Sequence, residues 1–248
     1  MSTEDSDNRE IIWTAAVNGD WKTVKQWLER EPSLIDVTGS VTIDERERND
    51  WSLLYLAVMQ GCDMDVMKFL VSHGADINGV QPDTHGGIYG FSTLHAAVQF
   101  HSSVEVLDYL ISHGADVDAK VCCETPLFTA AQIHSDVDII KCLVSAGSDI
   151  HARDCCSRTT PLHYIAETYS DVDLWEFLMS HGADINIEGA DGWTPFLIVA
   201  KENTIEVLKY LVSQGADLNA RNKKGRTAFD VADTDEKKIF LLECMQYS

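Results

Sequence analysis

The stretch Ser180-His-Gly-Ala-Asp-Ile-Asn186 decides the fold, because close copies of it recur along the chain. A second phrase, Thr160-Pro-Leu-His163 in its fullest form, runs in step with the first. Self-similarity at a fixed period of about 20–50 residues is the signature of a stacked-repeat protein. The glycine of the first phrase returns at spacings of 40, 33, 35 and 33 residues, at Gly74, Gly114, Gly147, Gly182 and Gly215.

Each repeat is predicted to form two short helices. In Thr160-Pro161, a residue that caps helix N-termini precedes the residue favoured at the first helical position. The recurring glycine suits the end of the second helix, where a positive φ is needed. Neither helix can bury its apolar face within one repeat, so stacked neighbours must supply the core. The second helix has apolar residues at helical spacing, for example Val104, Leu107, Leu110 and Ile111.

These phrases resemble the ankyrin repeat family over residues 9–246. The resemblance implies an all-α fold, an ankyrin-repeat solenoid of helix-turn-helix units joined by β-hairpin or loop connections. We predict one domain, 1–248, with insertions near 38–47 and 80–87. Terminal repeats meet water on one side, so Lys237 is expected at the polar outer side of the last one. The predicted repeats are 9–37 (an N-terminal cap), 48–79, 87–119, 120–152, 155–187, 188–220 and 221–246 (a C-terminal cap).

Composition narrows the function. The 248 residues include 19 Lys and Arg against 40 Asp and Glu, a formal charge of −21. That charge argues against direct nucleic-acid binding, which needs a basic surface. No apolar run approaches the ~20 residues of a membrane span, and the acidic start is unlike a secretory signal. We therefore expect a monomeric cytoplasmic protein with no membrane association. Location in the nucleus or in the cytosol of a host cell is left open.

Motifs of catalysis are not found. The sequence contains no Gly-x-x-x-x-Gly-Lys, His-Glu-x-x-His or Gly-x-Ser-x-Gly pattern. We expect no enzymatic activity and no cofactor. For His95 and His163, the family resemblance implies hydrogen bonds to backbone that link neighbouring repeats. The histidines before a helix-ending glycine, whose charge suits the last carbonyls of a helix, are His73, His113 and His181.

Two cysteine pairs form the alternative site. Cys122-Cys123 and Cys155-Cys156 lie 33 residues apart, in the same connection of consecutive repeats. Stacking should bring the two connections together, and four thiols could bind zinc. This pattern favours a metal- or redox-responsive regulator as the alternative function. Adjacent cysteines lack the two-residue spacer of zinc knuckles, so small, tolerated residues at the tips remain the simpler interpretation.

The leading interpretation is a non-catalytic adaptor that binds a partner protein. The family resemblance places its binding face on the hairpin tips and first helices, and the acidic charge favours a partner with a basic patch. Exposed aromatics over the second and third repeats suggest the main contact, although Trp51 and Trp193 could instead pack half-buried. An effector or subunit that retargets an enzyme in trans would use the same surface. The candidate partner-binding residues are Trp51, Met59, Tyr89, Phe91, Gln99, Phe100, Gln132 and Trp193.

Overall fold

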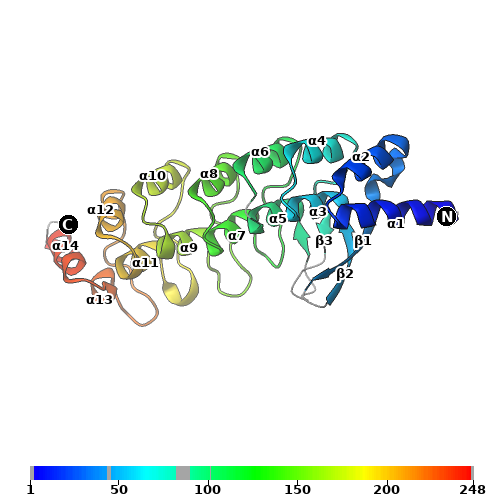
Figure 1. The fold of residues 1–248 in the computed structure, drawn as a ribbon. Coiled ribbons are helices and arrows are strands. Elements are labelled where there is room, and N and C mark those ends of the chain that lie inside the picture. The colour runs from blue at the N-terminus through cyan, green and yellow to red at the C-terminus, as the bar shows by residue number, and fades with distance from the viewer. Residues whose placement is uncertain (1–2, 44–45, 82–89, 101, 247–248) are drawn as a thin grey trace. The chain divides into compact units, whose positions relative to one another are not determined.

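The computed structural model describes residues 3–43, 46–81, 90–100 and 102–246. Contacts divide the chain into two compact units, Met1–Val121 and Cys122–Ser248. Each unit is a stack of helix pairs (Figure 1). The division of the chain into seven repeats of a single domain stays a prediction.

The first unit combines helix pairs with two small sheets. Helices α3 and α5 pack against each other and form the inner row, while α4 and α6 lie on the outer side (Figure 1). Its elements are α1 (Thr3–Val17), α2 (Trp21–Arg30), the 3₁₀ helix η1 (Pro32–Asp36), β1 (Thr38–Ile43), β2 (Arg46–Ser52), α3 (Leu53–Met59), α4 (Met64–Ser72), β3 (Val80–Gln81), β4 (Phe91–Ser92), α5 (Thr93–Gln99) and α6 (Val104–Ser112).

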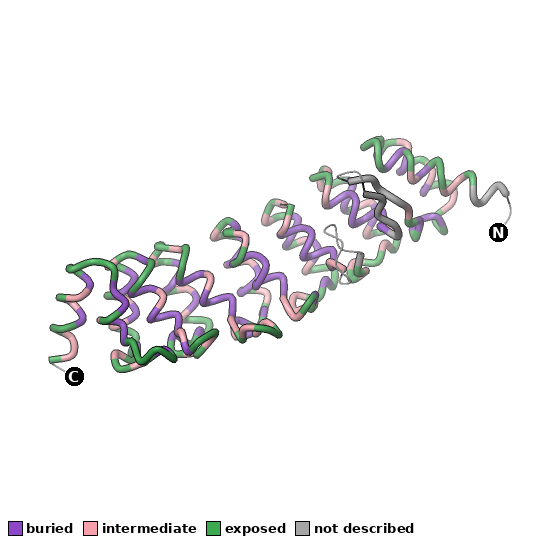
Figure 2. The backbone as a smooth tube through the Cα atoms, turned by 90° about the horizontal axis from the view of Figure 1, so that it is seen from below, coloured by how far each residue is buried: buried purple, intermediate pink, exposed green. Residues whose placement is uncertain are grey.

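The second unit repeats one arrangement. Inner helices α7, α9, α11 and α13 pack in succession, and α8, α10, α12 and α14 form the outer row. Backbone along the packed faces is buried (Figure 2). Its elements are α7 (Pro126–Gln132), α8 (Val137–Ser145), α9 (Pro161–Thr168), α10 (Val172–Ser180), the 3₁₀ helix η2 (Ala190–Gly192), α11 (Pro195–Glu202), α12 (Ile205–Ser213), α13 (Ala228–Val231) and α14 (Asp235–Gln246).

Local capping starts the inner helices where the sequence predicts. A Ser or Thr hydroxyl accepts a hydrogen bond from the backbone N–H three residues later, which satisfies a donor that the helix itself leaves open. This bond begins helices α3, α5, α7, α11 and α13, at Ser52, Ser92, Thr125, Thr194 and Thr227.

The ends of the outer helices are also as predicted. The recurring glycines have φ between 86° and 99°, the left-handed conformation that favours glycine. The histidine before three of them donates from Nδ1 to the carbonyl oxygen four residues earlier, at 2.8 Å. The expected contact with the last carbonyls is therefore confirmed for His73, His113 and His181.

The insertion near 38–47 contributes a strand pair, one of the two kinds of connection that the family resemblance implied. Strands β1 and β2 are antiparallel, with Thr38 opposite Ser52 and an irregularity between Gly39 and Val41. Trp13 of α1 packs on Gly39, where an added Cβ would lie 2.5 Å from the ring. Most of the second insertion, 82–87, lies outside the described residues.

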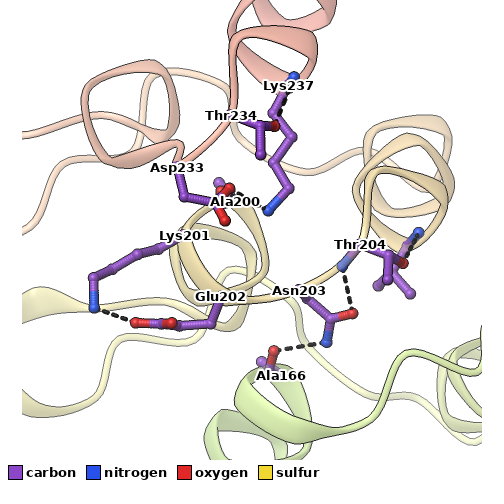
Figure 3. Close-up of polar contacts among 10 residues, drawn as sticks. Ala166, Ala200, Lys201, Glu202, Asn203, Thr204, Asp233, Thr234 and Lys237 are labelled. Carbon is purple, nitrogen blue, oxygen red and sulfur yellow. Dashed lines mark hydrogen bonds and ion pairs between the residues drawn. The ribbon is translucent and has the colours of Figure 1, made fainter.

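Side-chain bonds across repeats hold the C-terminal end (Figure 3). The Asn203 amide donates to the carbonyl oxygens of Ala166 and Tyr169, each at 2.9 Å. The expectation that Lys237 faces water is wrong, because its side chain is only 3% exposed. Its Nζ donates to the Asp233 carboxylate at 2.7 Å and to the Ala200 carbonyl at 3.3 Å. The apolar stem of a lysine can be buried when its ammonium group finds such partners.

Over residues 3–43, 46–81, 90–100 and 102–246, no helix combines the length and apolar character needed to cross a membrane.

Candidate partner-binding surface

A cleft of about 280 Å³ lies between α9 and α11 in the second unit. We call it the inner groove. It lies at the junction of the fifth and sixth predicted repeats, on the side of the first helices. Its walls combine two aromatic rings, one branched aliphatic chain and three charged groups, from Tyr164, Glu167, Trp193, Ile198, Lys201 and Glu202.

His163 fixes one wall of the inner groove. Its Nδ1 accepts hydrogen bonds from the backbone N–H and the hydroxyl of Thr160, at 3.2 and 2.8 Å. Its Nε2 then carries the proton and donates to the Trp193 carbonyl oxygen at 3.1 Å. The Gly189 N–H donates to the same oxygen at 2.8 Å. Burial lowers the pKa of His163, which favours this neutral form.

The two aromatic rings are held from different directions. Tyr164 meets Phe128 edge to face at 5.3 Å between ring centroids, and its hydroxyl shares a hydrogen bond with the Gln132 side chain. Trp193 is half-buried, and Lys201 Nζ lies 5.8 Å from its ring centroid. Lys201 also pairs with Glu202. The rings are therefore positioned by packing and polar contacts while part of each stays accessible.

The charges of nearby carboxylates act on Tyr164. Burial raises the pKa of its hydroxyl, and the negative charges of Asp154, Glu124 and Glu167 raise it further, against the lowering effect of the Gln132 hydrogen bond. Burial, together with Asp154, also raises the pKa of Glu124. A phenol on which three carboxylate charges act lies in a region of negative potential, which suits a cationic group of a ligand.

Comparison with known proteins decides the family. The family model described as ankyrin repeats, in three copies, matches residues 11–121, 118–189 and 170–242. The chain belongs to the ankyrin repeat family. The predicted all-α fold of stacked ankyrin units is confirmed. No curated protein matches the chain in sequence.

Solved ankyrin domains resemble the chain in structure. The ankyrin repeat domain of Bcl-3, described as a unique member of the IkappaB protein family, has a TM-score of 0.70 at 23% identity, covering 94% of this chain and 97% of that one. The human ASB11 ankyrin repeat domain has a TM-score of 0.68 at 25% identity, covering 94% and 96%. At this identity the Bcl-3 likeness shows the shared ankyrin fold alone.

The ankyrin hydrogen bond implied for His163 is confirmed, because its ring links α9 to the backbone of the next repeat. His95 is fully buried, and its Nδ1 lies 2.7 Å from the Ser92 hydroxyl.

Trp51 requires a correction. The sequence analysis placed it among the exposed aromatics of the binding face, with partial burial as the alternative. Its side chain is 0% exposed and meets Tyr55 edge to face at 5.1 Å. The residue lies in strand β2, opposite Gly39 of β1. A fully buried ring cannot contact a partner, so Trp51 leaves the candidate set.

The other candidates in the first unit are dispersed. Phe100 at the end of α5 is 39% exposed. Phe91 is half-buried and contacts the His95 ring at 6.0 Å. Met59 and Gln99 are half-buried at the ends of α3 and α5. Tyr89 lies outside the described residues.

In the second unit the structure brings two candidates toward one surface. Trp193 lines the inner groove, and Gln132 contacts Tyr164, which lines it too. Sequence reasoning did not identify Tyr164, which directly follows His163. Marking the exposed positions of the inner helix would have identified this residue.

The cysteine pairs do meet, as predicted from stacking. Cys155 Sγ lies 3.6 Å from the Cys122 carbonyl oxygen. Among the residues that the structure describes, no group of three or more His, Cys, Asp or Glu side chains is arranged to hold a metal ion. The metal-responsive alternative therefore gains no support from the geometry.

Proposed function

We propose that the chain is a non-catalytic adaptor whose inner groove binds a segment of a partner protein that carries arginine or lysine. The observation that carries the proposal is that Glu167, Tyr164 and Trp193 line one cleft. The charges of Glu124 and Asp154 act on the same tyrosine. Membership of the ankyrin family, whose repeats generally mediate protein contacts, supports the same reading.

The chemistry of the inner groove fits a cation better than an anion or an apolar side chain. An aromatic face attracts a guanidinium or ammonium group, and Lys201 already lies near the Trp193 ring. Lys201 is itself paired with Glu202, whereas Glu167 is exposed at the Tyr164 side. An arginine placed there would stack on the Tyr164 ring and form an ion pair with the Glu167 carboxylate.

The acidic charge of the whole chain supports the same partner chemistry. A formal charge of −21 attracts a basic segment over distance and speeds association at low salt. Binding should therefore weaken as ionic strength rises, since added salt screens exposed charges.

The test uses fluorescein-labelled peptides of random flanking sequence with a fixed central residue, measured by fluorescence anisotropy against the whole chain. We expect the arginine set to bind more tightly than the glutamine set. Tyr164→Ala and Glu167→Gln should each weaken arginine binding several-fold, whereas Phe100→Ala, a partly exposed aromatic of the other unit, should not. Equal binding of both peptide sets, or equal loss in the Phe100 variant, would reject the inner groove as the site.

A further inference from the structure

The tips of two successive hairpin connections in the second unit bring three thiols together. One tip is the turn from Val121 to Glu124, in which Cys122 and Cys123 have φ of 50° and 72°. The other precedes α9 and carries Cys155 and Cys156, both exposed. The two connections hang side by side below α7 and α9 (Figure 1).

Cys155 is the central sulfur of this group, which we call the thiol cluster: Cys123, Cys155 and Cys156. Its Sγ lies 3.8 Å from Cys156 Sγ, and its side chain shares a hydrogen bond with Cys123 of the other tip. Its bond to the Cys122 carbonyl, at 3.6 Å, holds it against the first tip. The cluster therefore joins two connections that are about thirty residues apart in sequence.

We propose that Cys123 and Cys155 form a reversible disulfide that ties the two tips together. The oxidant is a low-molecular-mass disulfide such as oxidised glutathione. None of these thiols lines the inner groove, and the inference does not depend on the proposed partner.

Bond geometry selects this pair among the cysteines of the cluster. A disulfide ordinarily joins Cα atoms roughly 4.4–6.8 Å apart. Adjacent residues across a trans peptide lie only about 3.8 Å apart. The pairs Cys155–Cys156 and Cys122–Cys123 are therefore disfavoured. Cys123 and Cys155 come from different segments, and Cys155 Sγ already lies 3.6 Å from the carbonyl oxygen of Cys122, the residue before Cys123.

The exchange has two balanced steps. Cys155 loses its proton to solvent, and its thiolate attacks one sulfur of the oxidised glutathione, releasing the other half as a thiolate that takes up a proton. Cys123 then loses its proton, attacks Cys155 Sγ in the mixed disulfide and releases the second glutathione. Two protein thiols are oxidised to one disulfide while one glutathione disulfide is reduced to two thiols.

The environment suggests which sulfur reacts first. The hydrogen bond with Cys155 is the main cause that raises the pKa of both Cys123 and Cys156. Cys155 is exposed whereas Cys123 is half-buried, so the oxidant reaches Cys155 first and Cys123 completes the exchange. The reaction should quicken as pH rises, because the resolving thiol must lose its proton.

The test treats the folded chain with oxidised glutathione, blocks residual thiols and digests with trypsin without reduction. Cleavage after Lys120, Lys141, Arg153 and Arg158 gives the peptides 121–141 and 154–158. We expect one cross-linked product of these two peptides, which dithiothreitol separates. The product should persist in Cys122→Ser and Cys156→Ser and vanish in Cys123→Ser and Cys155→Ser.

A second measurement distinguishes a disulfide that the fold favours from non-specific oxidation of exposed thiols. The cross-linked chain should melt at a temperature several degrees above that of the reduced chain, because the bridge restricts the unfolded ensemble. The same oxidation in concentrated urea should lose its preference for this pair. Persistence of the cross-link in Cys123→Ser, a product confined to peptide 154–158, or a stable glutathione adduct on Cys155 would each overturn the proposal.

Discussion

His163 Nε2 lies 3.1 Å from the carbonyl oxygen of Trp193, a residue of the following repeat. The buried imidazole thus connects the core of α9 to a residue whose ring lines the inner groove. Stacking of the fifth and sixth repeats and the shape of the inner groove depend on the same hydrogen bond. A substitution that breaks it is expected to alter both.

Acid should weaken the fold partly through His163. Burial lowers the pKa of this group in the folded chain, whereas the unfolded value is about 6.5. The unfolded chain therefore binds the proton first, so the free energy of unfolding contributed by His163 is full above about pH 6.5 and falls as the pH drops below it. Urea unfolding followed by circular dichroism, from about pH 7.5 to about pH 5.5, measures this loss.

The matched variants are His163→Asn and, at an exposed histidine, His134→Asn. The stability advantage of the unmodified chain over His163→Asn should shrink as the pH falls, because the variant lacks the titrating ring. His134→Asn should follow the unmodified chain throughout. Parallel pH curves for His163→Asn and the unmodified chain would contradict this role.

Gly189 should tolerate no side chain. An added Cβ would lie 2.5 Å from His163 Nε2, although its φ of −107° is open to other residues. Gly189→Ala should therefore destabilise the chain by about 1–3 kcal/mol through overpacking alone. Chemical denaturation measures the change. In a His163→Ala background the ring is gone, so the same substitution should cost much less. An equal cost in both backgrounds would show that the clash is not with the ring.

Asn203 should contribute more than any exposed neighbour. Asn203→Ala leaves the carbonyls of Ala166 and Tyr169 without their amide donor. We expect a loss of about 2–3 kcal/mol in the free energy of unfolding, since buried polar groups lose their partners. Glu202→Ala, on the adjacent exposed residue, should change stability by less than about 0.5 kcal/mol. Similar thermal melts for the two variants would contradict the assigned bonds.

Trp51 should contribute strongly to the free energy of unfolding. Removing a large, fully buried aromatic ring leaves a cavity and costs about 3–5 kcal/mol. Trp51→Ala should therefore lower the urea midpoint strongly, whereas Phe100→Ala, on a partly exposed ring, should change it little. A Trp51 variant as stable as the unmodified chain would restore Trp51 to the binding face.

The helix pairs could be predicted from sequence because their signals are local. Thr125 caps a helix through an atom three residues away, and Gly182 ends one through its own φ of 86°. Repetition of such signals at one period identifies the stacked fold. It also predicted that the cysteine tips would meet, because equivalent positions of neighbouring repeats lie side by side.

Residues whose environment comes from other segments could not be placed this way. Sequence determined that aromatic side chains stand near the first-helix caps. Only the tertiary structure decided that Trp51 is buried and that Trp193 lines a cleft with Tyr164. The Lys237 side chain is buried against the Ala200 carbonyl of α11, a distant segment, and it also pairs with Asp233, four residues earlier. Helix starts and ends depend on side chains only a few residues away in sequence, whereas burial depends on which distant surfaces pack together.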